Sequence, residues 1–169
     1  GHGVPGAFMS MIGNSLLDKC VIQLGIKSPE KILNKLNIEL YKKLSVNEDS
    51  KVKDGMDLFV CCIDLTKMKL YASGAYNPMY IVREKELTEF KGDKLHLGNL
   101  EHTRDKSYTL HDFDLQKEDC IYLFTDGFPD QKGGEKSKKF YYPPFRKLLT
   151  EISTQKMEGQ KEVLSETFN

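Results

Sequence analysis

The segment 120–130 contains the strongest candidate for chemistry in this sequence. It reads CIYLFTDGFPD, an apolar run followed by Asp126, a glycine and a second carboxylate, Asp130. We expect Asp126 to emerge at the rim of a sheet, where a rigid strand end fixes its carboxylate and Gly127 lets the chain turn. Carboxylate oxygens suit hard cations such as Mg²⁺ or Mn²⁺. The alternative is a turn whose aspartate accepts local backbone hydrogen bonds, and spacing alone does not separate the two.

Two further segments combine glycine with residues that can bind ions. Residues 1–8, GHGVPGAF, predict a glycine-rich turn that runs into a helix, where an anion can approach the backbone. A tight turn needed for packing is the preferred interpretation of that motif alone. In residues 53–57, KDGMD, the carboxylate of Asp54 stands before a predicted strand and can hold a hard cation. Taken alone, an ordinary Asp-Gly turn is the preferred interpretation there.

Helices are predicted first. Apolar residues recur at helical spacing over residues 8–20, and Gly25 provides a stop signal. A second helix has Ser28 as its cap and Pro29 at its first position. The apolar stripe of this second helix consists of Ile32, Leu33, Leu36, Leu40 and Leu44.

The middle third of the chain predicts strands. The candidate runs are 57–65, 69–75, 79–84, 108–115 and 120–127. The first and last are nearly all apolar, as expected for strands covered on both faces, and Asn77 is expected to fix a hairpin turn. Close spacing favours antiparallel pairing, because parallel crossovers need about a dozen residues. With helices also predicted over 145–152 and 161–168, the sequence indicates an α+β fold with helices packed on an antiparallel sheet.

Composition limits the classes of partner. The chain has 169 residues, enough for one domain with a sizeable core. Lys+Arg and Asp+Glu both number 25, and this balance gives no support to a nucleic-acid or anionic-membrane partner. No apolar run is long enough to cross a bilayer. The cysteines form no CxxC pair, and a cytoplasmic location with reduced thiols fits best; they are Cys20, Cys61, Cys62 and Cys120.

Five motifs run in order from Gly1 to about residue 149: GHGVPGAFMS, DGMDLFVCCID, YASGAYNPMYIV, LHLG and YLFTDGFPDQ. Together they resemble the SpoIIE-like branch of the metal-dependent protein phosphatases (PPM, or protein phosphatase 2C-like). The resemblance implies a single domain over residues 1–169, with a PPM-type αββα sandwich of two antiparallel sheets flanked by helices. That fold agrees with the elements predicted above.

The resemblance also implies a chemistry. In that family, two divalent ions held by aspartates activate a water that attacks a phosphoserine or phosphothreonine. Asp126 corresponds to a central metal-ligand aspartate, whereas Asp130 and Asp54 correspond to acidic positions near a third, looser metal. The implied activity is a protein serine/threonine phosphatase, a phosphoric monoester hydrolase, with Mn²⁺ or Mg²⁺ as cofactor.

The chain departs from the family pattern at both ends. An Asp-x-Thr/Ser motif would precede Gly1, and an Asp-Asp strand would follow Asn169. On this interpretation the chain is a fragment without its N-terminal and C-terminal strands, and Asp126 is its one core carboxylate. We therefore expect weak metal binding and little activity. Unpaired edge backbone can also associate between copies, which leaves a homodimer as an open alternative.

The implied partners are those of a bacterial signalling protein. They are a phosphorylated protein substrate, for example an anti-sigma-factor antagonist of the STAS type, and an upstream sensor domain. The main alternative is a catalytically impaired, phosphatase-like output domain that only binds a regulatory partner. A nucleotidyl or other phosphoryl-transfer enzyme is a weaker rival, because no P-loop or kinase glycine motif is present. His2 is interpreted as structural, and the lysines of the loop 132–139 as a solvated charge run.

Overall fold

The computed structural model describes residues 3–44, 55–99, 106–133 and 138–168. The chain divides into two compact units, and each is described by itself. Unit 1 comprises Gly1–Asn77 and Lys91–Leu115, and unit 2 comprises Pro78–Phe90 and Gln116–Asn169. None of the helices in the described part of the chain is long and apolar enough to cross a membrane.

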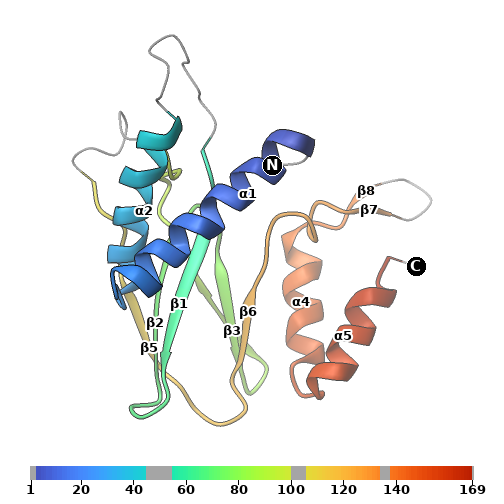
Figure 1. The fold of residues 1–169 in the computed structure, drawn as a ribbon. Helices are drawn as coiled ribbons and strands as arrows, with labels where there is room; N and C mark the ends of the chain where they lie inside the picture. Colours follow the sequence, from blue (N-terminus) through green and yellow to red (C-terminus); the bar gives the residue numbers. More distant parts are fainter. Residues whose placement is uncertain (1–2, 45–54, 100–105, 134–137, 169) are drawn as a thin grey trace. The chain divides into compact units, whose positions relative to one another are not determined.

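Unit 1 combines helices with an antiparallel sheet (Figure 1). Its helices are α1 (Gly3–Asp18), the π-helical turn η1 (Lys19–Gln23) and α2 (Pro29–Leu44). Its strands are β1 (Leu58–Asp64), β2 (Lys69–Ala75) and β5 (His111–Asp114), and they lie in the order β1-β2-β5 with antiparallel pairing throughout. The sequence therefore predicted the helices and the pairing direction of this unit correctly.

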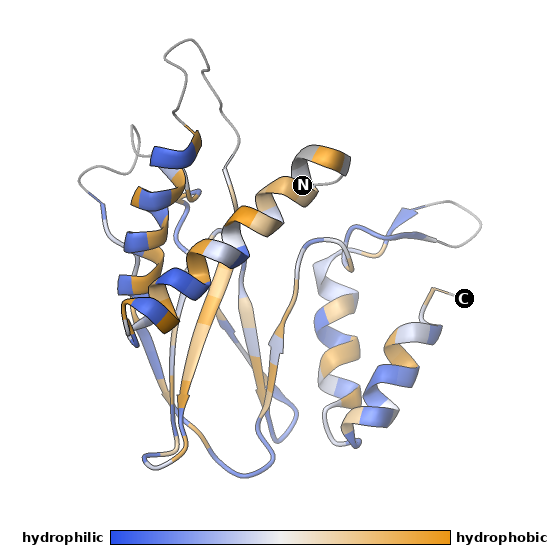
Figure 2. Cartoon of the chain, in the orientation of Figure 1, coloured by the Kyte–Doolittle hydropathy of each residue, from blue (hydrophilic) through white to orange (hydrophobic). Residues whose placement is uncertain are grey.

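Helix α2 forms as its sequence signals indicate. The Ile32 amide donates to the Ser28 carbonyl at 2.9 Å, so the first helical bond closes over Pro29. Hydrophilic residues follow one side of α2 and hydrophobic residues the other (Figure 2). The hydrophobic side enters a core shared with α1 and the sheet, and its buried members are Ile32, Leu33, Leu36 and Leu40.

A buried asparagine of α2 forms a hydrogen bond with the segment that precedes β5. Asn37 is 4% exposed, and its Oδ1 accepts a 2.7 Å hydrogen bond from the Gly98 amide. Gly98 has a φ of +89°, a conformation that side chains other than glycine rarely adopt. The Asn37 side chain thereby satisfies the backbone amide of Gly98, at a turn that only glycine adopts easily.

Unit 2 also places helices beside an antiparallel sheet. The strands β3 (Met79–Arg83), β4 (Glu86–Phe90) and β6 (Cys120–Leu123) lie in the order β4-β3-β6. A short ribbon follows, formed by β7 (Lys132–Gly133) and β8 (Lys138–Lys139), and then the helices α4 (Tyr142–Ile152) and α5 (Met157–Glu166). The buried core residues are Tyr80, Phe145, Leu149 and Ile152.

Three strand predictions need correction. Asn77 does not fix a hairpin, because β2 pairs with β1 and β5 whereas β3 pairs with β4 and β6, so the chain changes sheets there. β6 is an edge strand among the described residues and not an interior one. β1 also lies at a sheet edge, and it is half-buried with Ile63 45% exposed, although its apolar sequence predicted cover on both faces.

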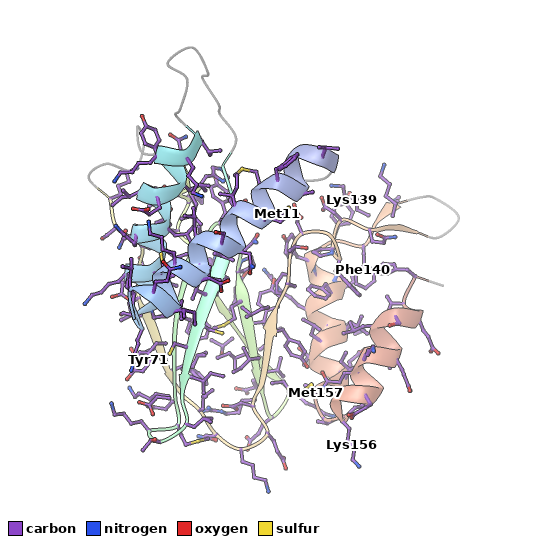
Figure 3. All side chains as sticks on the ribbon, viewed as in Figure 1. Met11, Tyr71, Lys139, Phe140, Lys156 and Met157 are labelled. Atoms are coloured by element: carbon purple, nitrogen blue, oxygen red, sulfur yellow. The ribbon has the colours of Figure 1, made fainter. Side chains whose placement is uncertain are left out.

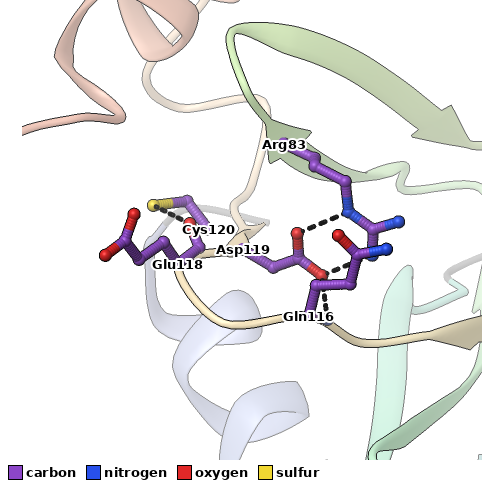
Figure 4. Close-up of polar contacts among 5 residues, drawn as sticks. All are labelled: Arg83, Gln116, Glu118, Asp119 and Cys120. Atoms are coloured by element: carbon purple, nitrogen blue, oxygen red, sulfur yellow. Dashed lines mark hydrogen bonds and ion pairs between the residues drawn. The ribbon is translucent and has the colours of Figure 1, made fainter.

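An ion pair fixes the start of β6 against the end of β3 (Figure 4). The Arg83 guanidinium donates to Asp119 twice, from Nε to Oδ1 at 2.8 Å and from Nη2 to Oδ2 at 2.7 Å. The Gln116 amide donates to Asp119 Oδ2 at 2.8 Å. The Asp119 side chain is only 3% exposed, and the hydrogen bonds from Arg83 hold its pKa below the ordinary value.

We predict that Asp119→Ala destabilises the chain by about 2–3 kcal/mol at neutral pH, because it removes two charge-assisted hydrogen bonds between Arg83 and a carboxylate that is only 3% exposed. Urea denaturation measures the change. Asp114→Ala is the control, since the Asp114 side chain is 81% exposed and lies 3.4 Å from Lys69 Nζ, and it should change stability by about 0.5 kcal/mol at most.

The same ion pair predicts a pH dependence. The folded-state pKa of Asp119 is lowered, so its stabilisation is present above the unfolded pKa of about 3.9 and is lost as the pH falls through the folded-state value. The stability difference between the wild type and Asp119→Ala should therefore shrink in acid. A difference that stays constant down to pH 2 would contradict the assignment.

Candidate metal centre

Asp126 lies on a short turn beyond β6. The strand ends at Leu123, and the turn over 126–130 is closed by a 2.8 Å hydrogen bond from the Asp130 amide to the Asp126 carbonyl. The Gly127 amide donates to Thr125 Oγ1 at 3.3 Å. The hydroxyl of Thr125, and not the carboxylate of Asp126, therefore accepts the local backbone bond that the turn offers.

The Asp126 carboxylate is exposed and uncommitted. Within the described ranges of the chain, no side chain or amide gives it a hydrogen bond or an ion pair. The sequence left open whether this aspartate serves the turn or a ligand. The turn that the structure shows is maintained by other atoms, so the carboxylate stays available to a cation.

Asp130 lies on the same turn but has a partner. Its Oδ2 is 2.7 Å from Lys139 Nζ, and the two side chains are 45% and 40% exposed. The hydrogen bond to Asp130 raises the pKa of Lys139 above its ordinary value, and the charge of Asp126 acts in the same direction. Figure 3 labels Lys139 and Phe140 where β8 ends. The turn therefore carries one free carboxylate and one that a lysine neutralises.

Aromatic packing fixes the turn from within unit 2. Phe128, in the middle of the turn, has its ring centroid 4.8 Å from that of Phe145 and 4.7 Å from that of Phe168. Phe124, just before the turn, lies 5.0 Å from Phe145 and 4.7 Å from Tyr80 in the same measure. Aromatic pairs at these separations attract one another beyond the area they bury, so the residue before the turn and the middle of the turn are held on one cluster.

Two backbone hydrogen bonds join the residues after β8 to the end of this turn and to the residue that follows it. The Tyr141 amide donates to the Pro129 carbonyl at 2.7 Å, and the Phe140 amide donates to the Gln131 carbonyl at 2.9 Å. Tyr141 has a φ of +67°, a strained conformation for a tyrosine that the surrounding bonds maintain. Burial, and secondarily the charge of Asp126, raises the pKa of Tyr142 in the helix that follows.

The other predicted site residues are only partly described. Asp54, Gly1 and His2 lie outside the described residues. The glycine-rich turn expected over residues 1–8 is wrong over residues 3–8, because α1 begins at Gly3. No group of three or more His, Cys, Asp or Glu side chains that could hold a metal gathers in the part of the chain that the structure describes.

The donor set that is described fits part of a hard-cation site. Asp126 and Asp130 supply carboxylate oxygens on one fixed, exposed turn, and oxygen is the ligand atom that Mg²⁺ and Mn²⁺ prefer. These two residues are the candidate ligands that the structure brings together. The metal assignments of Asp126, Asp130 and Asp54 remain predictions.

Sequence reasoning missed a cluster in unit 1. His96 Nδ1 lies 2.5 Å from Asp57 Oδ1, and the His96 ring stacks on Tyr76 with centroids 4.0 Å apart and planes 6° apart. No spacing could have signalled this cluster, because the three residues come from distant segments. The bridge between Met56 and Leu97 brings them together, through reciprocal backbone bonds of 3.0 Å.

Comparison with known proteins identifies the class of fold. The SiaA PP2C domain of Pseudomonas aeruginosa superposes with a TM-score of 0.86 at 29% identity, over 99% of this chain and 63% of that one. This likeness confirms the PPM-type, PP2C-like α+β fold predicted from the sequence. The chain therefore spans less than two thirds of the SiaA domain's length.

More distant structures have the same fold. The RsbU and RsbW domains of a Mycobacterium tuberculosis protein match with a TM-score of 0.67 at 18% identity, over 97% of this chain and 42% of that one. The PP2C phosphatase domain of Bacillus subtilis SpoIIE, with a fragment of its regulatory domain, matches at 0.63 and 16%, over 92% and 43%. No curated protein matches the chain.

The family follows from the sequence match. The family model described as Stage II sporulation protein E (SpoIIE) matches residues 1–169, which is the whole chain. The chain belongs to the SpoIIE family. The five sequence motifs had already indicated that the chain resembles this family.

We predict that Phe128→Ala destabilises the chain by about 2–3 kcal/mol, because a partly buried ring leaves a cavity among Phe140, Phe145 and Phe168. Denaturant unfolding measures this, and amide exchange at Asp130 should accelerate as the turn loosens. Phe8→Ala is the control, since Phe8 is 61% exposed and its loss should be nearly neutral. Equal effects of the two substitutions would show that the turn does not depend on this cluster.

Proposed function

We propose that this chain is part of the catalytic domain of a divalent-metal-dependent protein phosphatase that hydrolyses phosphoserine or phosphothreonine. The observation that carries the proposal is the exposed carboxylate of Asp126, which is fixed by its turn and left without a partner among the described residues. Membership of the SpoIIE family and the likeness to the SiaA PP2C domain support it.

The residues of the turn have distinct roles in this proposal. Asp126 holds the cation through a carboxylate that needs no rearrangement, and Asp130 offers a second oxygen donor four residues later. Thr125 keeps the Gly127 amide satisfied, so the turn does not draw on Asp126. Bound Mn²⁺ or Mg²⁺ would supply a more acidic water and charge neutralisation at the phosphoryl oxygens.

The substrate in this proposal is a phosphorylated protein of a bacterial signalling system, and an anti-sigma-factor antagonist of the STAS type is the expected example. We also propose a cytoplasmic location and control by an upstream sensor domain.

We predict that phosphate release from a phosphoserine peptide by the full-length protein requires added Mn²⁺ or Mg²⁺, and that Asp126→Asn lowers kcat at least about 100-fold by removing a charged metal ligand. A phosphate-release assay with and without chelator measures both effects. Asp114→Asn is the control, because it also removes an exposed carboxylate, on β5 of unit 1.

Two results would contradict the proposal. Turnover that persists in chelator would exclude metal dependence, and full turnover by Asp126→Asn would exclude the assigned ligand. If the metal-loaded wild type binds a phosphorylated partner but releases no phosphate, the output-domain alternative is the correct one.

A further inference from the structure

The ammonium group of Lys139 stands where a cation bound to Asp130 would have to bind. Nζ is 2.7 Å from Asp130 Oδ2, a full charge-assisted contact to one of the two carboxylate oxygens. A divalent ion at that oxygen would lie within a few ångströms of the ammonium, where two positive charges repel strongly. The two cations therefore exclude one another at Asp130.

The backbone imposes this position on Lys139. The residue comes just before Phe140 and Tyr141, whose amides donate to the carbonyls of Gln131 and Pro129 on the turn. The Phe140 ring packs with centroids 5.8 Å from Phe128 and 5.4 Å from Phe168. The residues directly after β8 are thus held against the acidic turn and Gln131, and this attachment keeps Lys139 beside Asp130.

The neighbouring lysine is placed differently. In the β7–β8 ribbon Lys139 is opposite Lys132, whereas Lys138 is opposite Gly133. Successive side chains of a strand point to opposite faces, so Lys138 points away from the side on which Lys139 meets Asp130. Lys138 has no ion pair with any residue that the structure describes. If this run of lysines merely faced solvent, neither lysine would have a fixed partner. Lys139, however, is paired with Asp130.

We propose that Lys139 is an internal competitor for the divalent cation at Asp130, so that a metal binds there only when the ammonium moves away. The inference rests on the proposed function, because it takes Asp130 as a metal ligand. Both side chains are about 40–45% exposed, and ion pairs of that exposure are weak enough for a metal to displace. The flexible stem of lysine lets the ammonium leave without moving β8.

The competition raises the metal-ion concentration that is needed to fill the position at Asp130. In the absence of metal, Lys139 neutralises one of two carboxylates on a single turn and so reduces their mutual repulsion. Metal binding at Asp130 must displace that contact, so the looser position fills only at a higher ion concentration than the carboxylates alone would set. Asp126 keeps its carboxylate free of this competition.

The test uses Mn²⁺ alone as the probe and the full-length protein, with free Mn²⁺ followed by electron paramagnetic resonance. Lys139→Met should tighten Mn²⁺ binding by about 3–10-fold, through loss of the competing ion pair and of one nearby positive charge. Lys138→Met is the matched control. It removes the same charge one residue away and should change the affinity by less than about 2-fold.

A double-substitution cycle tests whether the effect passes through Asp130. In an Asp130→Asn background, Lys139→Met should tighten Mn²⁺ binding by less than about 2-fold, because only the loss of a nearby positive charge remains. An unchanged affinity of Lys139→Met, an equal gain from Lys138→Met, or a gain that survives Asp130→Asn undiminished would each overturn the proposal while the wild type still binds Mn²⁺. Failure of every variant to bind Mn²⁺ would instead reject the metal dependence in the proposed function, and this inference with it.

Discussion

The candidate site depends on the packing of one aromatic ring beneath a five-residue turn. An exposed aspartate on a loop ordinarily samples many orientations, and ordering it for a ligand then reduces the affinity. Here Phe128 lies inside the turn and packs on Phe145 and Phe168, while the Asp130 amide closes the turn onto the Asp126 carbonyl. The carboxylate of Asp126 is thus placed by hydrophobic burial and not by polar contacts, which would have occupied its oxygens.

Two aspartates on one turn repel each other, and the structure provides a counter-ion to only one of them. Like charges this close raise the free energy of the turn unless a counter-ion is present. Lys139 supplies that counter-ion to Asp130, whereas Asp126 is left without one among the described residues. The family resemblance implies different roles for the two positions, with Asp126 as a central ligand and Asp130 as part of a looser one, and these roles stay predictions.

Local sequence signals predicted the elements that obey them. Pro29 after Ser28 gave the start of α2, and the apolar stripe gave its buried side. Asp126 does follow a strand, but β6 ends at Leu123, so a turn and not the strand end carries the carboxylate. Strand β4 was missed because the turn before it uses Glu84 and Lys85, both at positive φ, where glycine or asparagine is the usual signal.

The pairing partners of the strands and the contacts between distant segments could not be predicted from the sequence. The choice of β1 and β5 as partners of β2 turned the Asn77-Pro78 step into a change of sheet, since a strand with two partners has no free edge for a third. The same holds for the pair of Asp57 and His96, and for the pair of Asp130 and Lys139, because each joins residues whose proximity is set by backbone bonds elsewhere. Spacing along the chain carries no record of such contacts.

Fold membership alone does not decide whether this domain is catalytic, because one fold supports both enzymes and binding modules. Catalysis is proposed because the turn leaves the Asp126 carboxylate without a partner among the described residues. The Asp119 carboxylate, by contrast, is buried and committed to an ion pair with Arg83. Thr125, one residue before Asp126, meets the demand of the turn for an acceptor. The proposed enzyme, as opposed to a binding domain, consequently depends on the Asp126 carboxylate, which has no partner among the described residues.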